Sequence, residues 1–215
     1  HRIGIAFSEA IKRRNDARVE VRGERMFGKS LFAFDAEADS YLVADQNKHL
    51  YLIAANDPGL KRSHLTTVDK TRRTVELTYE DVAASCISTD VAVFEATLDI
   101  GRIALAADTL GAAQNMLDQA VEYAKQREQF NRPIASFQAV KHMCAEMAAQ
   151  LEPCRSMVWF AGHALAELPD EARVTACHTK AHLAEVAQFV AKTATEVHGG
   201  MGFTDLVGLH YWFKR

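Results

Sequence analysis

The sequence predicts an α+β protein that is mostly helical, in which a small antiparallel β-domain is followed by an antiparallel helical bundle. Two patterns predict this fold class. Up to about residue 85, apolar residues alternate with polar ones in short runs, which is typical of strands with one buried face. From residue 91 onward they recur at steps of three and four, which is typical of amphipathic helices. We therefore expect a β-domain over residues 1–90 and a helical domain over residues 91–215.

Strands are expected where short apolar runs lie between turn residues. They cover residues 17–22, 25–32, 41–44, 49–55 and 74–79. Val75, Leu77 and Tyr79 share one face of the last of these strands. Asn56-Asp57-Pro58-Gly59 is a strong turn signal. Short strands joined by turns favour an antiparallel sheet or a small barrel over βαβ units.

Three long helices are expected next, each with one apolar stripe. The stripes run from Ile103 to Ala124, from Phe137 to Leu168 and from Ala176 to Val197. Short loops at residues 131–133 and 168–170 make consecutive helices antiparallel.

Several single residues refine this expectation. Pro153 is expected to kink the second helix, Asp170 to cap the third, and a final helix to start near Thr204 or Asp205. Apolar residues beyond the stripes predict a second apolar face, and hence association with another subunit. These residues are Met116, Met143, Met157, Trp159 and Phe160.

Composition excludes several classes of protein. Apolar residues make up 48% and charged residues 25%, which is typical of a globular chain and not of a disordered one. The net charge of −3 gives no basic surplus, so no nucleic-acid partner is expected. The apolar stretches are far shorter than the roughly 20 residues that span a bilayer, so no membrane span is expected.

The cysteines and the chain ends bear on the compartment and on processing. Four cysteines without a CxxC pair predict reduced thiols in a cytoplasmic protein. No secretory leader is visible at the start. The chain starts at His1 and ends in an aromatic run, which fits a processed chain, a truncated chain or a piece of a longer polypeptide.

One histidine pair has a spacing that could hold a metal. His178 and His182 share a helix face, with Glu185 one turn further on, and this spacing could bind zinc. The glutamate that zinc proteases carry directly after the first histidine is missing, so surface or packed histidines are the preferred reading, and no metal is expected. Cys144 and Cys154 lie on the apolar stripe and are expected to be buried as small apolar residues.

Two further segments each allow a structural and a functional reading. Gly199-Gly200-Met201-Gly202 follows a helix, so it forms either a helix C-cap or a backbone that lets a phosphate or flavin approach closely. Arg127 and Arg132 flank a phenylalanine and a turn at a helix end. They form either a solvated helix end or an anion site.

Taken together, these segments resemble the acyl-CoA dehydrogenase family. Residues 123–134, YAKQREQFNRPI, followed by SFQAV at 136–140, are similar to its YAxxRxQFGxPI…FQ signature. Residues 196–203, EVHGGMGF, are similar to its Q/E-x-H-G-G-x-G-F segment, and residues 209–215 match the helix that follows. Residues 1–95 resemble the family's central β-domain more loosely, so this domain is expected to be partial and divergent. The family's N-terminal helical domain has no counterpart in the chain.

The resemblance implies an FAD-dependent flavoprotein of fatty-acid or other lipid metabolism. A base removes the α-proton of an acyl-CoA, and the β-hydride goes to the flavin. It also implies an electron-transfer flavoprotein or a similar electron acceptor, and assembly into a homo- or hetero-oligomer, a dimer or tetramer.

The resemblance also assigns site residues. Arg127 and Gln138 would contact the FAD pyrophosphate or adenine end, with Gln129 and Phe130 beside them. Glu196, Gly199 and Gly200 would approach the FAD of a neighbouring subunit. Asp99 and Arg102 would lie near the acyl-CoA.

The departures from the family pattern concern the catalytic base and the flavin loop. The family's usual catalytic glutamate falls beyond Arg215, and its alternative position holds Gly101, so no base is visible and the catalytic residue is unknown. Asp99 is the nearest carboxylate, but on a helix it points about 160° away from position 101. We expect the 215-residue chain alone to be inactive. The alternatives are a base-lacking subunit of a hetero-oligomer and a non-enzymatic oligomerisation scaffold.

Three more departures weaken the flavin side of the resemblance. Glu196 stands where many members have glutamine, and so brings a carboxylate towards a diphosphate. Lys29 takes a place usually held by a small hydroxyl residue. Ala10-Ile11-Lys12-Arg13-Arg14 replaces the glycine-serine loop that cradles the flavin.

Overall fold

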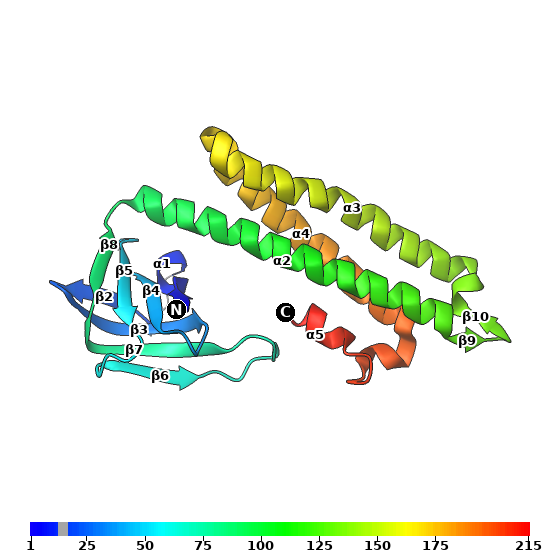
Figure 1. The fold of residues 1–215 in the computed structure, drawn as a ribbon, viewed down its shortest axis with the longest axis horizontal. Helices are drawn as coiled ribbons and strands as arrows, with labels where there is room; N and C mark the ends of the chain where they lie inside the picture. Colours follow the sequence, from blue (N-terminus) through cyan, green and yellow to red (C-terminus); the bar gives the residue numbers. More distant parts are fainter. Residues whose placement is uncertain (13–16) are drawn as a thin grey trace. The chain divides into compact units, whose positions relative to one another are not determined.

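The computed structural model describes residues 1–12 and 17–215, which form two compact units, residues 1–97 and 98–215 (Figure 1). The first unit is a β-sheet domain, and the second is built of long helices. This is the α+β class that the sequence predicts. None of the helices in the described residues is both long enough and apolar enough to cross a bilayer.

The first unit holds one sheet with the strand order β6-β7-β3-β1-β4-β5-β8, and β2 pairs with β3. The strands are β1 (Ile3–Ala6), β2 (Val19–Arg22), β3 (Arg25–Phe34), β4 (Ser40–Ala44), β5 (Leu50–Ala54), β6 (Leu60–His64), β7 (Thr74–Ala83) and β8 (Ser85–Ser88). All recorded pairings are antiparallel except that of β1 with β4, which is parallel. The short apolar runs of the sequence did not predict β1, β6 or β8.

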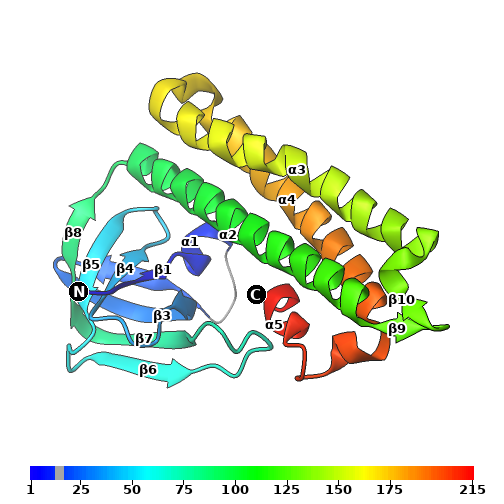
Figure 2. The same ribbon diagram turned by 45° about the vertical axis from the view of Figure 1, so that its right-hand side comes forward.

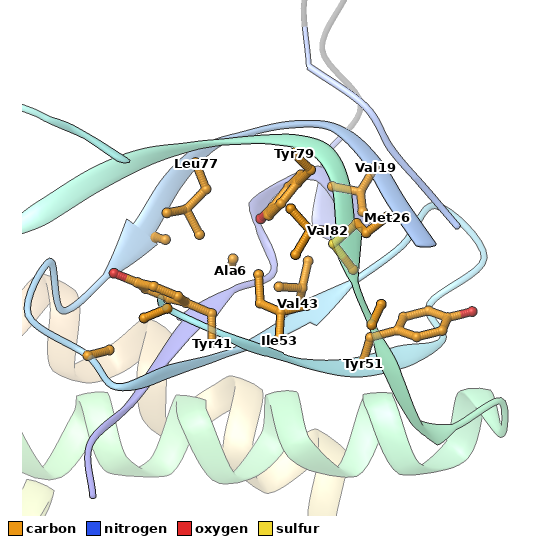
Figure 3. Packing of buried hydrophobic residues seen from close by; sticks show 14 of the residues in the cluster. Ala6, Val19, Met26, Tyr41, Val43, Tyr51, Ile53, Leu77, Tyr79 and Val82 are labelled. Carbon is orange, nitrogen blue, oxygen red and sulfur yellow. The ribbon is translucent and has the colours of Figure 1, made fainter. Parts of the chain in front are cut away.

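The buried faces of these strands enclose the core of the first unit (Figure 3). Val75, Leu77 and Tyr79 are all at most 2% exposed, as their alternation predicts. The Tyr79 hydroxyl, buried among them, donates a hydrogen bond of 2.9 Å to Ser30 Oγ. Alternation therefore decided which side chains of β7 are buried, because successive residues of a strand point to opposite faces.

A short helix α1 (Ser8–Ile11), which no sequence pattern predicted, follows β1. Its Glu9 is only 3% exposed, and its carboxylate accepts hydrogen bonds from the Leu31 amide at 2.9 Å and the Ser8 hydroxyl at 2.7 Å. Of the segment expected to replace the flavin loop, Ala10 and Ile11 belong to α1. Arg13 and Arg14 lie outside the described residues.

The helices are α2 (Val91–Gln126), α3 (Gln138–Glu167), α4 (Pro169–His198) and α5 (Leu209–Phe213). Figures 1 and 2 both show α3 and α4 lying side by side, joined by a tight connection. The three predicted stripes meet in one core, which includes Leu117, Leu151 and Leu183. The helix α3 continues through Pro153. The antiparallel bundle follows from these stripes, because each helix can bury its apolar face only against the others.

Two predicted helix starts are wrong. Asp170 is not the N-cap of α4, because Pro169 occupies the first helical position and Leu168 the N-cap. Proline suits that position, since its missing N–H needs no partner there. The final helix starts at Leu209 and not near Thr204 or Asp205. Residues Gly199–Phe203 form a 3-10 helix, η2, and Gly208 precedes α5 with a φ of +69°.

The predicted second apolar face is smaller than expected. Met116 is only 2% exposed and belongs to the bundle core. Met143 and Met157 are half-buried. Trp159 and Phe160 on α3 are exposed, at 78% and 48%.

Candidate functional site

The chain that joins α2 to α3 forms a tight hairpin, where the sequence predicted a plain loop. Strands β9 (Glu128–Gln129) and β10 (Arg132–Pro133) pair antiparallel, and Phe130 and Asn131 between them have positive φ angles of 55° and 61°. Positive φ at both central residues is the pattern of a two-residue hairpin. The turn leaves the Phe130 ring 86% exposed, and it meets the Phe137 ring edge-on at 6.0 Å.

Arg127 lies at the base of this hairpin. Its amide donates to the Tyr123 carbonyl at 2.8 Å, and its own carbonyl accepts from the Ile134 amide at 2.7 Å, so the last turn of α2 and the residue that follows β10 hold its backbone. Its side chain is exposed and has no carboxylate partner among residues 1–12 and 17–215. An arginine whose backbone is fixed and whose guanidinium has no partner can bind an anion through several donors at once.

The neighbouring polar groups are exposed and only weakly engaged. The Gln129 amide group donates to the Glu128 carbonyl at 2.9 Å, and the Gln138 amide lies 3.4 Å from the His142 ring. The Arg132 guanidinium stacks over the Phe137 ring, 4.0 Å from its centroid. Apart from the half-buried Phe137, the side chains in this group are exposed to solvent.

The C-terminus of α4 meets the last turns of α2. The His198 ring stacks on the Tyr123 ring with centroids 4.6 Å apart, and its Nδ1 donates to the Ala194 carbonyl at 2.7 Å. That bond assigns a proton to Nδ1, because a carbonyl oxygen can only accept. Nε2 is buried without a hydrogen-bond partner in the described part of the chain. The stack brings residues 123–127 and 196–200 to one end of the bundle.

The glycines after His198 play different roles. Gly199 ends α4 with a φ of +57°, so the helix C-cap reading is confirmed. A Cβ at Gly200 would meet no atom within 4 Å, whereas a Cβ at Gly202 would lie 2.9 Å from the Thr195 carbonyl oxygen. Glycine at 202 is thus required by packing. Gly200 leaves its backbone open, as the flavin reading of this segment needs, and that reading stays a prediction.

A cavity of about 370 Å³ lies beside this turn. It is lined by Ala191, Lys192, Thr195, Glu196, Gly199, Phe203 and Phe213. The exposed Glu196 carboxylate and the Lys192 ammonium are its charged groups, and the rest of its wall is mostly apolar. Such a cavity suits a flat ring with a polar edge.

The predicted substrate residues Asp99 and Arg102 are in contact. Asp99 is only 4% exposed, and its Oδ1 accepts a hydrogen bond from Arg102, one helical turn further on. Its Oδ2 accepts a hydrogen bond of 3.2 Å from Nε of Arg173 on α4. The sequence analysis missed Arg173, because it lies 74 residues away and no local pattern links it to Asp99.

Gly101 lies between these two residues, and a Cβ there would meet no atom within 4 Å. Position 101 therefore has room for a side chain but holds none. Asp99, the nearest carboxylate in sequence, has both oxygens engaged by guanidinium groups. Neither oxygen is therefore free to approach a substrate carbon without losing one of these contacts.

The structure provides no support for a zinc site. His178, His182 and Glu185 are exposed, and the described residues contain no group of histidine, cysteine and acidic side chains that could hold a metal ion. All four cysteines are free thiols. Cys154 is buried as predicted, Cys144 is half-buried, and burial raises the pKa of both thiols. Lys29 is paired with Glu76 at 2.8 Å, so its ammonium is neutralised within the sheet.

Comparison with known proteins identifies the family of this chain. Residues 91–215, more than half of the chain, match the model of the acyl-CoA dehydrogenase C-terminal domain. The chain is 34% identical over 151 residues to acyl-CoA dehydrogenase IpdE2 of Mycobacterium tuberculosis, which covers 70% of this chain and 44% of that protein. It is 38% identical over 107 residues to the caffeyl-CoA reductase-Etf complex subunit CarC of Acetobacterium woodii, covering 50% and 28%.

A solved structure gives the same result. Butyryl-CoA dehydrogenase of Megasphaera elsdenii superposes with a TM-score of 0.80 at 25% identity, over 100% of this chain and 57% of the other. The chain thus spans less than half the length of these two relatives and a little over half of that structure. The fold, the two signature segments and these matches together show that the chain belongs to the acyl-CoA dehydrogenase family.

Proposed function

We propose that this chain carries FAD- and substrate-binding parts of an acyl-CoA dehydrogenase that oxidises the Cα–Cβ bond of a CoA thioester. One observation supports this most directly. The Arg127 guanidinium, unpaired within residues 1–12 and 17–215, and the open backbone at Gly200 lie at the same end of the bundle, joined by the Tyr123–His198 stack. In a chain of this family, that combination suits a bound dinucleotide.

The donor set at this end fits the diphosphate of FAD. Arg127 supplies forked donors with no carboxylate partner among the described residues, and the exposed amides of Gln129 and Gln138 can donate further hydrogen bonds. The Phe130 ring, exposed on its hairpin, offers an apolar face beside them. FAD, when bound, supplies the hydride acceptor, and the role of these residues is to hold it.

The turn at Glu196–Gly200 is proposed to meet the FAD of a neighbouring subunit. Gly199 and Gly200 present backbone without side chains, which allows close approach. The exposed Glu196 carboxylate opposes a diphosphate electrostatically, so we assign it to the ring-binding or solvent side of the turn. This arrangement requires at least a dimer.

Asp99 and Arg102 are proposed to lie beside the CoA thioester. Arg102 is about one-third exposed, so its guanidinium can reach a ligand while one nitrogen stays on Asp99. A relative is named as a subunit of a complex with Etf, which supports an electron-transfer flavoprotein as the electron acceptor. We also propose a cytoplasmic location, which the four free thiols support. Oxidation of an acyl-CoA would give the protein a role in lipid metabolism.

A second candidate is a subunit of a hetero-oligomer that obtains its catalytic base from another polypeptide. Gly101, which holds no side chain, and the doubly bound Asp99 favour this arrangement. Both candidates require FAD, whereas an oligomerisation scaffold does not.

Isothermal titration of the purified protein with FAD tests the proposal, together with its absorption spectrum after gel filtration. Flavin that stays with the protein, with saturable binding, supports both enzymatic candidates. Protein that remains colourless and binds no FAD would leave the scaffold as the function. Riboflavin serves as the control ligand, because it lacks the diphosphate that Arg127 is proposed to hold.

A further inference from the structure

A buried carboxylate joins two helices of the bundle. The Asp99 side chain on α2 is only 6% exposed, and it contacts Arg102 on the same helix and Arg173 near the start of α4. An ionised carboxylate is costly to bury unless charged donors satisfy it. Here one guanidinium contacts each oxygen, so the two arginines together fix the plane of the carboxylate.

We propose that Arg173 is a positioning residue, which acts through Asp99 to hold the Arg102 guanidinium in one orientation. Arg173 bears on substrate binding only if the proposed function holds, because that function brings a CoA thioester to Arg102. Its effect on the orientation of Arg102 does not depend on any ligand.

The contacts explain why Arg173 has this effect. Arg102 and Asp99 are three residues apart on one helix, and a pair at this spacing on an open helix surface is held only loosely. Arg173 approaches from another helix and binds Oδ2, which stops the carboxylate from turning. Because a guanidinium is planar, a carboxylate that cannot turn also limits the plane of its partner.

Arg155 offers a matched control on the same bundle. It lies on α3 with its side chain 50% exposed, close to the 53% of Arg173. It also reaches across to α2, where it donates to Gln114 at 3.3 Å, but it has no contact with Asp99. Arg155→Ala therefore removes a similar side chain and a similar interhelical contact without changing the support of Arg102.

The first test is a nitrogen–proton correlation spectrum of the arginine Nε–Hε groups in the full chain, with the Arg102 signal assigned by its loss in Arg102→Lys. In the wild-type protein and in Arg155→Ala, Arg102 should give a resolved signal away from the position of free arginine. In Arg173→Ala that signal should broaden or move to the free position, and Arg173→Lys should restore it in part. An Arg102 signal unchanged in Arg173→Ala would overturn the proposal.

The second test is titration with butyryl-CoA. We expect Arg173→Ala to bind about tenfold more weakly than wild type, the lower end of what a lost charged hydrogen bond costs, because Arg102 itself remains. Arg155→Ala should bind like wild type, and Arg173→Lys should recover most of the affinity. Equal affinity of Arg173→Ala and wild type would overturn the role in binding.

These outcomes separate the two proposals. If wild type does not bind butyryl-CoA but the Arg102 signal still depends on Arg173, the substrate class of the proposed function fails and the positioning role stands. If Arg173→Ala does not fold, Arg173→Lys, which keeps the charge, replaces it, and its Arg102 signal and affinity are compared with those of Arg155→Ala. The Arg102 signal and the affinity that Arg173→Lys retains should then be lost in Asp99→Asn, and their persistence in Asp99→Asn would overturn the proposal.

Discussion

The Tyr123 and His198 rings stack with centroids 4.6 Å apart at an interplanar angle of 28°. They come from the last turn of α2 and the last turn of α4, and the contact joins the two segments that carry the family's signature residues. His198 is only 2% exposed and cannot leave this position without opening the bundle end. The stack thus fixes the base of the hairpin that holds Arg127, four residues after Tyr123.

Arg127→Ala should weaken FAD binding far more than it lowers the stability of the fold. Loss of one charge-assisted contact to a diphosphate costs about 1.5–3 kcal/mol. An exposed arginine without a partner adds little to folding. Titration with FAD and thermal unfolding measure the two effects.

Lys125→Ala is the control for Arg127→Ala. Lys125 is an exposed cation on the same helix end, but it is already paired with Glu122 at 2.7 Å. Its removal should leave FAD affinity nearly unchanged. An unchanged FAD dissociation constant in Arg127→Ala would contradict the assignment of this helix end to flavin.

The 215-residue chain by itself should show no acyl-CoA dehydrogenase activity, even with FAD supplied. Abstraction of the α-proton needs a carboxylate within hydrogen-bond reach of the substrate carbon. Position 101 has none, and two arginines occupy the Asp99 oxygens. An anaerobic mixture of the chain, FAD and a panel of acyl-CoAs should keep its flavin absorbance. Bleaching by any substrate would reveal a base, and Asp99→Asn would be the first variant to examine.

Gly101→Ala should stabilise the protein and Gly202→Ala should destabilise it. At 101 the new Cβ meets no atom within 4 Å, so the gain is the roughly 0.5–1 kcal/mol by which alanine exceeds glycine in a helix. At 202 the Cβ would lie 2.9 Å from the Thr195 carbonyl oxygen, and overpacking of this kind costs about 1–3 kcal/mol.

Chemical denaturation of both glycine variants measures these changes. Gly111→Ala is the control for the helix effect, since Gly111 lies on α2 with equally open space around it. A destabilised Gly101→Ala would mean that position 101 is not open, and that the room we infer for a side chain there does not exist.

Tyr79→Phe should lower the free energy of unfolding and reduce its dependence on alkaline pH. The variant removes the buried hydrogen bond to Ser30, which is worth about 1 kcal/mol. Burial raises the pKa of Tyr79 far above its ordinary value, with the nearby Glu9 adding to the rise. A raised folded-state pKa stabilises the fold fully below the unfolded value of about 10, and that stability is lost as the pH rises above it.

Denaturation of wild type and Tyr79→Phe between neutral and alkaline pH checks both effects. Burial also raises the pKa of Tyr51, so the alkaline slope should fall but not vanish. The double variant Tyr79→Phe/Ser30→Ala should recover part of the stability at neutral pH, because it leaves no hydroxyl without its partner. Equal alkaline slopes for wild type and Tyr79→Phe would contradict the assignment.

The protein should associate at micromolar concentration. Trp159 and Phe160 expose two neighbouring aromatic rings on α3, which is costly in water unless a partner covers them. Sedimentation velocity should show dimers or tetramers that weaken in Trp159→Ser/Phe160→Ser. Val174→Ser is the control, because Val174 is an apolar side chain 56% exposed on α4. Monomer alone would contradict both the association and an FAD site shared between subunits.

Local pattern was enough to predict the main elements, while the family followed from the resemblance of two signature segments, residues 123–140 and 196–203. Val75, Leu77 and Tyr79 are buried as their alternation predicts, and the apolar stripes of α2, α3 and α4 form one core. These predictions depend on the period of strand and helix, which neighbouring residues define by themselves. Where local rules competed, sequence reasoning failed. Asp170 was expected to be the N-cap of α4, but Pro169 occupies the first helical position and Leu168 is the N-cap.

Only the tertiary structure decided the contacts between distant segments. The parallel pairing of β1 with β4, the burial of Glu9 against the Leu31 amide and the support of Asp99 by Arg173 join residues between 22 and 74 positions apart. No repeat or spacing in the sequence marks such partners. They meet because the chain must bury its apolar faces. A carboxylate that is buried with those faces needs a hydrogen-bond donor, and the packing of the helices and strands decides which donor lies within reach.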